Sequence, residues 1–136
     1  MTFGKPRFNK KYEWELLRFC AKRNYHIPGG AGKMLKFFER SYSPKNLISY
    51  ADRCWSVGKV YYALGFALDH TSKPSYSYIK GNKCLSRIKC QKHKLKDMFE
   101  NFDPNMSEFD NMKKNGFRRV YDCGNLVFVK TYDDNT

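Results

Sequence analysis

The chain has 136 residues, with 26 Lys or Arg against 13 Asp or Glu, which gives a net charge of +13. This length permits one domain, or one domain with a tail, that buries a substantial core. The charge favours a polyanionic partner, above all nucleic acid, over an anionic membrane surface or a role in solubility alone.

Cysteine usage and hydropathy bear on the compartment. The five cysteines are an odd number at irregular spacing, which does not form a disulfide framework. Cys84, Cys90 and His93 lack a paired Cys-x-x-Cys, so we expect no metal centre. No run of residues reaches transmembrane length, and the first residues lack the apolar core of a signal peptide. The sequence therefore predicts a cytoplasmic protein.

The first nineteen residues predict a hairpin with a long basic loop. Residues 1–3 should end one strand and residues 12–19 should form the next, with residues 4–11 between them. Within the second strand neither alternating face is purely polar. We therefore expect helices on both sides of the sheet.

A glycine-rich turn follows and leads into a helix from about Ala31 to Arg40. Backbone amides at such a turn, together with the helix dipole, can hold a phosphate group. The segment is not a Walker P-loop, because Ile27 stands where the first glycine of that motif belongs. The candidate cofactor-binding residues here are Gly29, Gly30, Ala31, Gly32 and Lys33.

The stretch from Leu47 to Phe66 combines a strand, a charged corner and a helix. The strand ends at Asp52, and functional side chains gather at such carboxyl ends in α/β sheets. Asp52 is therefore a candidate catalytic carboxylate, although it could instead orient Arg53 or cap the turn. Ser56 is the expected N-cap of a helix that ends at Gly65. On the strand at residues 75–79, two tyrosines share one face, which favours packing over a stacking surface.

Residues 80–96 contain seven Lys or Arg and no acidic residue. We expect a helix from Ser86 that buries Ile88, Leu95, Met98 and Phe99 and presents basic side chains either to DNA phosphates or simply to solvent. A capping box at Ser107 predicts a short helix that ends at residues 115–116. Residues 117–122 and 126–130 then predict a small hairpin.

The candidate nucleic-acid-binding residues are basic or aromatic and come from the first loop, the charged corner, the basic run and the last strands. They are Lys5, Arg7, Lys10, Lys11, Arg53, Trp55, Arg87, Lys89, Lys92, His93, Lys94, Lys96, Arg118 and Arg119.

Several motifs in fixed order resemble the carboxyl-terminal region of phage-encoded homing endonucleases and related hypothetical phage proteins. They include Tyr12-Glu-Trp-Glu-Leu-Leu-Arg-Phe-Cys, Ser49-Tyr-Ala-Asp-Arg-Cys-Trp-Ser, Gln91-Lys-His-Lys-Leu and Arg119-Val-Tyr-Asp-Cys-Gly-Asn. The resemblance covers nearly the whole chain. It implies double-stranded DNA as a partner, in the cytoplasm of a phage's host cell. The chain has no His-Asn-His, paired Gly-Ile-Tyr and Tyr-Ile-Gly, or LAGLIDADG pattern, so we expect no familiar nuclease head.

The order of elements is also similar to the later half of the GCN5-related N-acetyltransferase (GNAT) fold, whose helix ends in a motif like Leu64-Gly-Phe66. This resemblance implies an α/β (α+β) fold, with a truncated GNAT-like mixed sheet flanked by helices over residues 1–80. Residues 81–136 would add the basic helix, the short helix and the hairpin. It further implies acetyl-CoA at Gly29 to Lys33, with Tyr61 or Tyr62 as the acid.

Three functions follow as hypotheses. The first is a DNA-binding accessory module of a homing-endonuclease-like protein, and the second is an acetyltransferase-like enzyme. The third is an active endonuclease that uses Mg²⁺ at Asp52 with Glu13, Glu15 or His93. An open sheet edge at the amino terminus would allow pairing with an upstream nuclease fragment or with a second copy.

Overall fold

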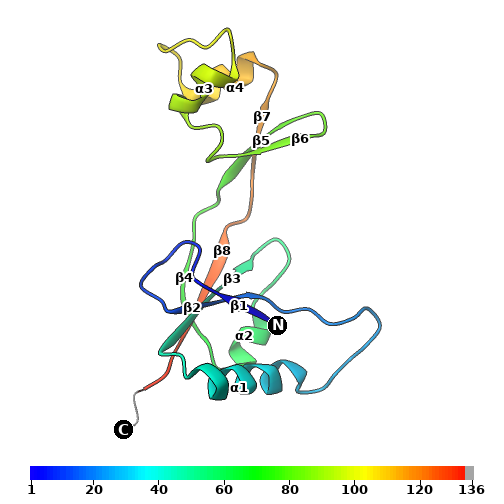
Figure 1. The fold of residues 1–136 in the computed structure, drawn as a ribbon. Helices are drawn as coiled ribbons and strands as arrows, with labels where there is room; N and C mark the ends of the chain where they lie inside the picture. The colour runs from blue at the N-terminus through cyan, green and yellow to red at the C-terminus, as the bar shows by residue number, and fades with distance from the viewer. Residues whose placement is uncertain (134–136) are drawn as a thin grey trace. The chain divides into compact units, whose positions relative to one another are not determined.

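The computed structural model describes residues 1–133, in which eight strands form two sheets and accompany four helices (Figure 1). The α+β class predicted from the sequence is confirmed. The chain divides into two compact units: residues 1–72 with the chain from Asn125 onward form the first, and residues 73–124 form the second. Residues 80 and 81, between which the sequence predicts a boundary, both lie in the second unit.

The first unit contains a five-stranded mixed sheet. Its strands, in spatial order, are β1 (Thr2–Gly4), β2 (Trp14–Arg18), β3 (Asn46–Asp52), β8 (Asn125–Thr131) and β4 (Ala67–Thr71). β1 and β2 form the predicted hairpin. β2 and β3 are parallel and are joined through helix α1 (Gly30–Tyr42), whereas β8 pairs antiparallel with both β3 and β4.

One face of this sheet carries the main core. Leu47 and Ala51 of β3 share a face with Phe128 of β8, and they cluster with Leu35 and Phe38 of α1. Helix α2 (Lys59–Ala63) covers the same face, because its Tyr61 ring stacks on Phe128 with centroids 4.7 Å apart. Both helices of the first unit therefore lie on one side of the sheet.

The opposite face is covered by the basic loop and not by a helix. Pro6 is buried in this loop, and the Phe8 ring meets Tyr50 edge-on with centroids 5.5 Å apart. Ile48 and Glu15 on this face are almost inaccessible to solvent. The prediction of helices on both sides was therefore wrong for the first unit as described over residues 1–133. Trp14 and Leu16 of β2 instead pack on the α1 side. On the other face, Glu15 is buried against the loop and Leu17 is exposed.

Helix α2 begins two residues later than a Ser56 N-cap would require. Its N-cap is Gly58, with φ 78°, and the Ser56 hydroxyl accepts a hydrogen bond from the Gly58 N–H at 3.0 Å. Only glycine fits there, because a Cβ at this position would overlap the Phe128 ring and the backbone is left-handed. The prediction of Ser56 as the N-cap was therefore wrong, and close packing fixed the start of the helix.

The second unit contains a three-stranded antiparallel sheet in the order β6 (Lys83–Ser86), β5 (Tyr76–Lys80) and β7 (Arg118–Tyr121). Helices α3 (Lys92–Met98) and α4 (Glu108–Lys114) complete it. Tyr78, Leu95, Met112 and Phe117 belong to its core. The predicted helix start at Ser107 is confirmed, because the Ser107 hydroxyl is the N-cap of α4: it accepts a hydrogen bond from the Asp110 N–H at 3.1 Å and donates to the Asp110 carboxylate at 2.7 Å.

The predicted helix from Ser86 was wrong over its first turns. Residues 83–86 form β6, and the helix begins only at Lys92. Leu95 is buried as expected, but Ile88 is 63% exposed and Met98 is also exposed. The physical reason is the hairpin of β5 and β6, in which Leu85 lies opposite the buried Tyr78.

The predicted hairpin of the last two strands was also wrong. β7 pairs with β5, while β8 pairs with β3 and β4. Phe117, just before β7, is buried in the core of the second unit, and Phe128 in β8 is buried in the core of the first. The two strands therefore belong to different units. No helix within residues 1–133 is long and apolar enough to cross a membrane.

Candidate functional site

The run of basic residues from 80 to 96, here called the basic segment, lies in the second unit and is exposed at all seven Lys and Arg positions. Within residues 1–133, none of these seven forms an ion pair with a carboxylate. Lys94 Nζ donates to the Ile88 carbonyl at 2.8 Å, and the Arg87 guanidinium lies 5.2 Å from the centroid of the Tyr76 ring. Lys80 Nζ likewise donates to the Asn115 carbonyl at 2.8 Å. These contacts leave all seven side chains exposed to solvent and their charge without an acidic partner in the described residues.

Three acidic side chains of the second unit, Glu108, Asp110 and Asp122, form local hydrogen bonds. Glu108 accepts hydrogen bonds from the hydroxyls of Tyr76 and Tyr78 at 3.0 and 3.1 Å. Asp110 accepts from the Ser107 hydroxyl, and Asp122 accepts from the N–H of Gly124 at 2.8 Å. These carboxylates cap turns and hold tyrosines, so they do not pair with the basic segment.

Arg118 and Arg119 lie next to each other on β7, but their surroundings differ. Arg118 is exposed, whereas the Arg119 guanidinium lies 4.1 Å from the Tyr76 ring centroid and donates to the Tyr78 hydroxyl at 2.8 Å. The Arg119 Nε is buried without a hydrogen-bond partner. Burial raises the pKa of Tyr78 to about 12. Arg119 therefore organises the tyrosines as well as adding charge.

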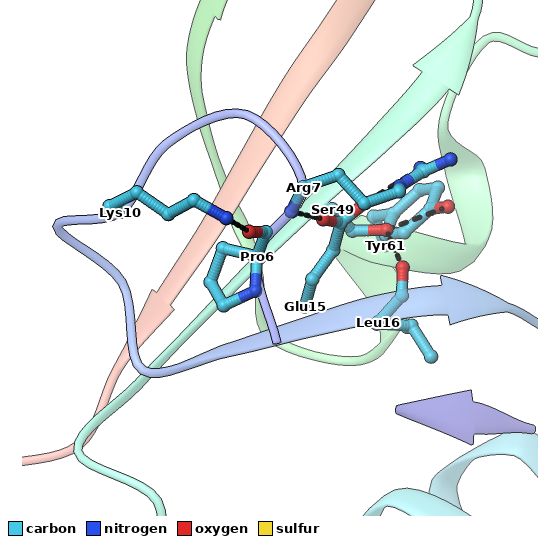
Figure 2. A network of polar contacts seen from close by, with 7 residues as sticks. All are labelled: Pro6, Arg7, Lys10, Glu15, Leu16, Ser49 and Tyr61. Atoms are coloured by element: carbon cyan, nitrogen blue, oxygen red, sulfur yellow. Dashed lines mark hydrogen bonds and ion pairs between the residues drawn. The ribbon is translucent and has the colours of Figure 1, made fainter. Parts of the chain in front are cut away.

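The basic loop of the first unit is held to the sheet by its own basic residues (Figure 2). Arg7 contacts the fully buried Glu15 three times, through its backbone N–H at 2.7 Å, Nε at 2.9 Å and Nη2 at 2.7 Å. Lys10 Nζ donates to the Pro6 carbonyl. Lys5 and Lys11 are exposed. Of the four cations predicted here, two are thus engaged in the structure of the loop.

The corner after β3 is a compact turn capped by Asp52. The Asp52 carboxylate accepts the Cys54 N–H at 2.8 Å, and its carbonyl accepts the N–H of Trp55 at 3.1 Å. Arg53 is exposed, and Trp55 is 89% exposed. This is the capping role that the sequence offered as an alternative to catalysis. Glu13 is bound to Lys45 and Asn46 at the far end of β3, so the structure does not bring it together with Asp52.

The glycine-rich turn lies open beside a hollow of the first unit. A Cβ at Gly29 or Gly32 would meet nothing within 4 Å, and Gly29 has φ 69°. The lining of the hollow comes from the chain after β2, the start of α1, and Val60, Ala63 and Leu64. A Cβ at Gly30 would lie 3.1 Å from the Ile27 side chain, so the turn is closed on that side.

β2 and β3 are paired at only two residue pairs, Trp14 with Leu47 and Glu15 with Ile48. Beyond them the Ser49 hydroxyl donates to the Leu16 carbonyl at 2.8 Å and bridges the two strands, as Figure 2 shows. Backbone pairing of the two parallel strands therefore ends after Glu15 and Ile48, on the side of the glycine-rich turn, and a side chain joins the strands beyond that point.

The two tyrosines named as candidate acids have different settings. The Tyr61 hydroxyl lies 3.2 Å from Ser49 Oγ and donates to it, because the Ser49 proton is given to the Leu16 carbonyl. The Tyr61 ring packs against Phe66 and Phe128. Tyr62 is 54% exposed and meets Phe128 edge-on. Tyr61 is the one whose hydroxyl lies where the backbone pairing of β2 and β3 ends.

Arg118 and Arg119 were named as candidates from the sequence, but the four residues that line a cavity with them, Phe109, Lys113, Phe117 and Tyr121, were missed. This cavity lies at β7 and α4. The available signal was the alternation of residues 117, 119 and 121, which places them on one face of a strand.

Among residues 1–133, no group of three His, Cys, Asp or Glu side chains is arranged to hold a metal ion. Comparison of the chain with protein-family models and with curated proteins finds no match.

Proposed function

We propose that this chain is a DNA-binding accessory module of a homing-endonuclease-like protein, acting in the cytoplasm of the cell that a phage infects. The observation that carries the proposal is the basic segment: seven exposed cations within seventeen residues, with no carboxylate pairing to them in the described part of the chain. A surface of this kind binds phosphates by releasing counterions. Lys5, Lys11, Arg53 and Trp55 on the first unit would add further contacts.

The contacts within the segment support phosphate binding over base reading. Residues 87–90 form a turn and α3 is only seven residues long, so the cations lie on short elements close together. Lysine side chains act as mobile point charges that follow a backbone of phosphates. We therefore expect affinity for duplex DNA with a modest dependence on sequence.

The test compares two triple variants that remove the same charge. Lys89→Ala/Lys92→Ala/Lys96→Ala removes three cations of the basic segment, and Lys36→Ala/Arg40→Ala/Lys45→Ala removes three exposed cations of the first unit. Fluorescence anisotropy with a labelled duplex is measured between 50 and 200 mM salt, as in ordinary counterion analyses. Each lost phosphate contact should reduce the slope of log K against log salt by about 1.

In the first triple variant, the slope of log K against log salt should therefore decrease in magnitude by up to about 3. In the second triple variant, the slope should stay close to that of the parent protein. Equal losses in both variants would assign the binding to net charge alone. A parent protein whose affinity does not change with salt would overturn the proposal.

A second candidate, an acyl-CoA-binding transferase, is favoured by one specific observation. Backbone pairing of β2 and β3 ends beside an open glycine-rich turn at the start of a thirteen-residue helix. The Gly30 and Lys33 amides already donate to the Ile27 and Gly29 carbonyls, so the amides of Gly29, Ala31 and Gly32 would hold a pyrophosphate. The apolar hollow next to them suits an extended chain. Coenzyme A, when bound, would carry the acyl group, and the Tyr61 hydroxyl would lie near the end of that strand pairing.

Calorimetry with coenzyme A tests this candidate on the intact chain. Gly32→Glu places a carboxylate at the amino end of α1, where a phosphate would bind, and should abolish any heat of binding. Gly32→Ala is the matched control, because a Cβ there meets nothing within 4 Å. A folded parent protein that gives no binding heat would reject the acyl-CoA function.

The edge of β1 offers a surface for assembly. Among the described residues, β1 pairs with β2 on one side only. An exposed strand edge can accept another strand. An upstream nuclease segment or a second copy of the chain would extend the sheet there, and sedimentation of the isolated chain separates these alternatives.

A further inference from the structure

The cavity at β7 and α4 in the second unit combines aromatic rings with positive charge. Its lining is Phe109, Lys113, Phe117, Arg118, Arg119 and Tyr121, and its volume is about 370 Å³. No acidic side chain belongs to this lining. Volumes of this order are typical of small-ligand sites.

Two of the rings are available for contact. Tyr121 is 60% exposed and Phe109 is 38% exposed, although both lie beside the partly buried Arg119. Large exposed rings on a strand next to cations are the arrangement on which unstacked bases are held. A single exposed ring would not indicate a base-binding site, but here the rings and the cations line the same cavity.

Arg119 keeps this hollow positively charged and in shape. Its guanidinium carbon lies 4.6 Å from the Phe109 centroid, and its Nη1 donates to the Tyr121 hydroxyl at 3.4 Å. Of the two α4 carboxylates, Glu108 accepts hydrogen bonds from the Tyr76 and Tyr78 hydroxyls, and Asp110 accepts one from the Ser107 hydroxyl. Arg119 therefore presents positive potential to the cavity without a carboxylate paired to it in the described residues.

We propose that this cavity binds one unpaired nucleotide, with the base stacked on Tyr121 and the phosphate held by Lys113 and Arg118. This inference rests on the proposed DNA-binding function and extends it from duplex phosphates to single-stranded or flipped-out bases. The basic segment would hold the duplex backbone, while the cavity would select DNA that offers an unstacked base.

The experiment measures binding of the full chain to labelled oligo(dT) and to a hairpin duplex of equal charge. Tyr121→Ala should weaken oligo(dT) binding by about tenfold, the effect of one lost base stack, and leave duplex binding within about twofold. Tyr121→Phe keeps the ring and should bind oligo(dT) nearly as well as the parent protein.

Two lysine variants that remove the same charge distinguish binding in the cavity from general electrostatic attraction to the oligonucleotide. Lys113→Ala and Lys114→Ala remove adjacent lysines from the last turn of α4, but only Lys113 lines the cavity. Lys113→Ala should therefore weaken oligo(dT) binding several times more than Lys114→Ala. Photocrosslinking with 5-iodouracil in the oligonucleotide should label Tyr121.

Two outcomes would overturn the inference while leaving the proposed function intact: oligo(dT) binding unchanged in Tyr121→Ala, or equal losses in the two lysine variants, with salt-dependent duplex binding retained in each case. A parent protein that binds neither oligonucleotide would overturn the proposed function itself. Circular dichroism of each variant identifies any loss that comes from unfolding.

Discussion

Replacing Arg7 by Leu tests whether the basic loop is held by the buried carboxylate of Glu15. The Glu15 side chain is fully buried, and the Arg7 side chain is 55% exposed. Removing one partner of a fully buried ion pair costs roughly 3–5 kcal/mol. The Arg7 side chain is partly exposed to water, and in the variant the backbone N–H of residue 7 still donates to Glu15. We therefore expect a smaller loss in the free energy of unfolding, about 2–3 kcal/mol.

The assay uses the two tryptophans of the chain, Trp14 and Trp55, which both lie in the first unit. Tryptophan fluorescence during urea unfolding therefore reports the stability of that unit. The Arg7→Leu variant should unfold at a lower urea concentration with an unchanged slope. Lys11→Leu, at an exposed cation of the same loop, should change the free energy of unfolding by less than about 0.5 kcal/mol.

A double-mutant cycle with Glu15→Gln isolates the interaction. The neutral amide needs no counter-charge, so Arg7→Leu should cost about 1–2 kcal/mol less in the Glu15→Gln background. Additive effects within about 0.5 kcal/mol would refute the ion pair as the source of stability. The salt dependence of DNA binding should not change in Arg7→Leu, because its guanidinium is engaged with Glu15.

Three further predictions concern glycine, tyrosine and asparagine positions. Gly58→Ala should lower the free energy of unfolding of the first unit, measured with urea, by about 2–4 kcal/mol, because the new Cβ would overlap the Phe128 ring. Gly32→Ala, where the Cβ enters open space, should raise it by about 0.5–1 kcal/mol. Equal effects of the two substitutions would contradict the packing argument. Tyr78 should ionise near pH 12 instead of 10, because its pKa is raised in the folded protein. The stability that comes from this raised pKa is complete below pH 10 and is lost as the pH rises toward 12. If the absorbance at 295 nm titrates identically in the parent protein and in Tyr78→Phe, this prediction is contradicted. Asn111→Ala should lower the free energy of unfolding by about 2–4 kcal/mol, as followed by far-ultraviolet circular dichroism. The buried Asn111 amide donates to three carbonyls and accepts from one N–H, and all four hydrogen bonds would be lost. A loss below about 1 kcal/mol would show that water replaces the amide.

Local signals identified most elements of the fold. The N-cap at Ser107 and the turn at Gly116 fixed α4, and the alternation around Tyr76 and Tyr78 fixed β5. These features depend on residues a few positions apart, so a single sequence reveals them. The glycine-rich turn and α1 were predicted for the same reason.

The wrong predictions all depended on long-range partners. Residues 117–122 and 126–130 resemble two arms of a hairpin, but each arm finds a distant strand that was formed earlier in the chain. Ile88 satisfies a helical period, yet the pairing of Leu85 with Tyr78 continues the strand instead. The pairing of Arg7 with Glu15 is a further long-range contact that the sequence did not predict, because nothing in the local pattern links the two residues.

The second unit is an insertion in the connection between β4 and β8. Ser72 and Asn125 hold each other through two hydrogen bonds of 2.8 Å, one from each backbone N–H, so the chain leaves and rejoins the first sheet at adjacent points. A short turn between them would make β4 and β8 an ordinary hairpin. A recombination event could therefore add, exchange or delete residues 73–124 without interrupting any strand of the first sheet.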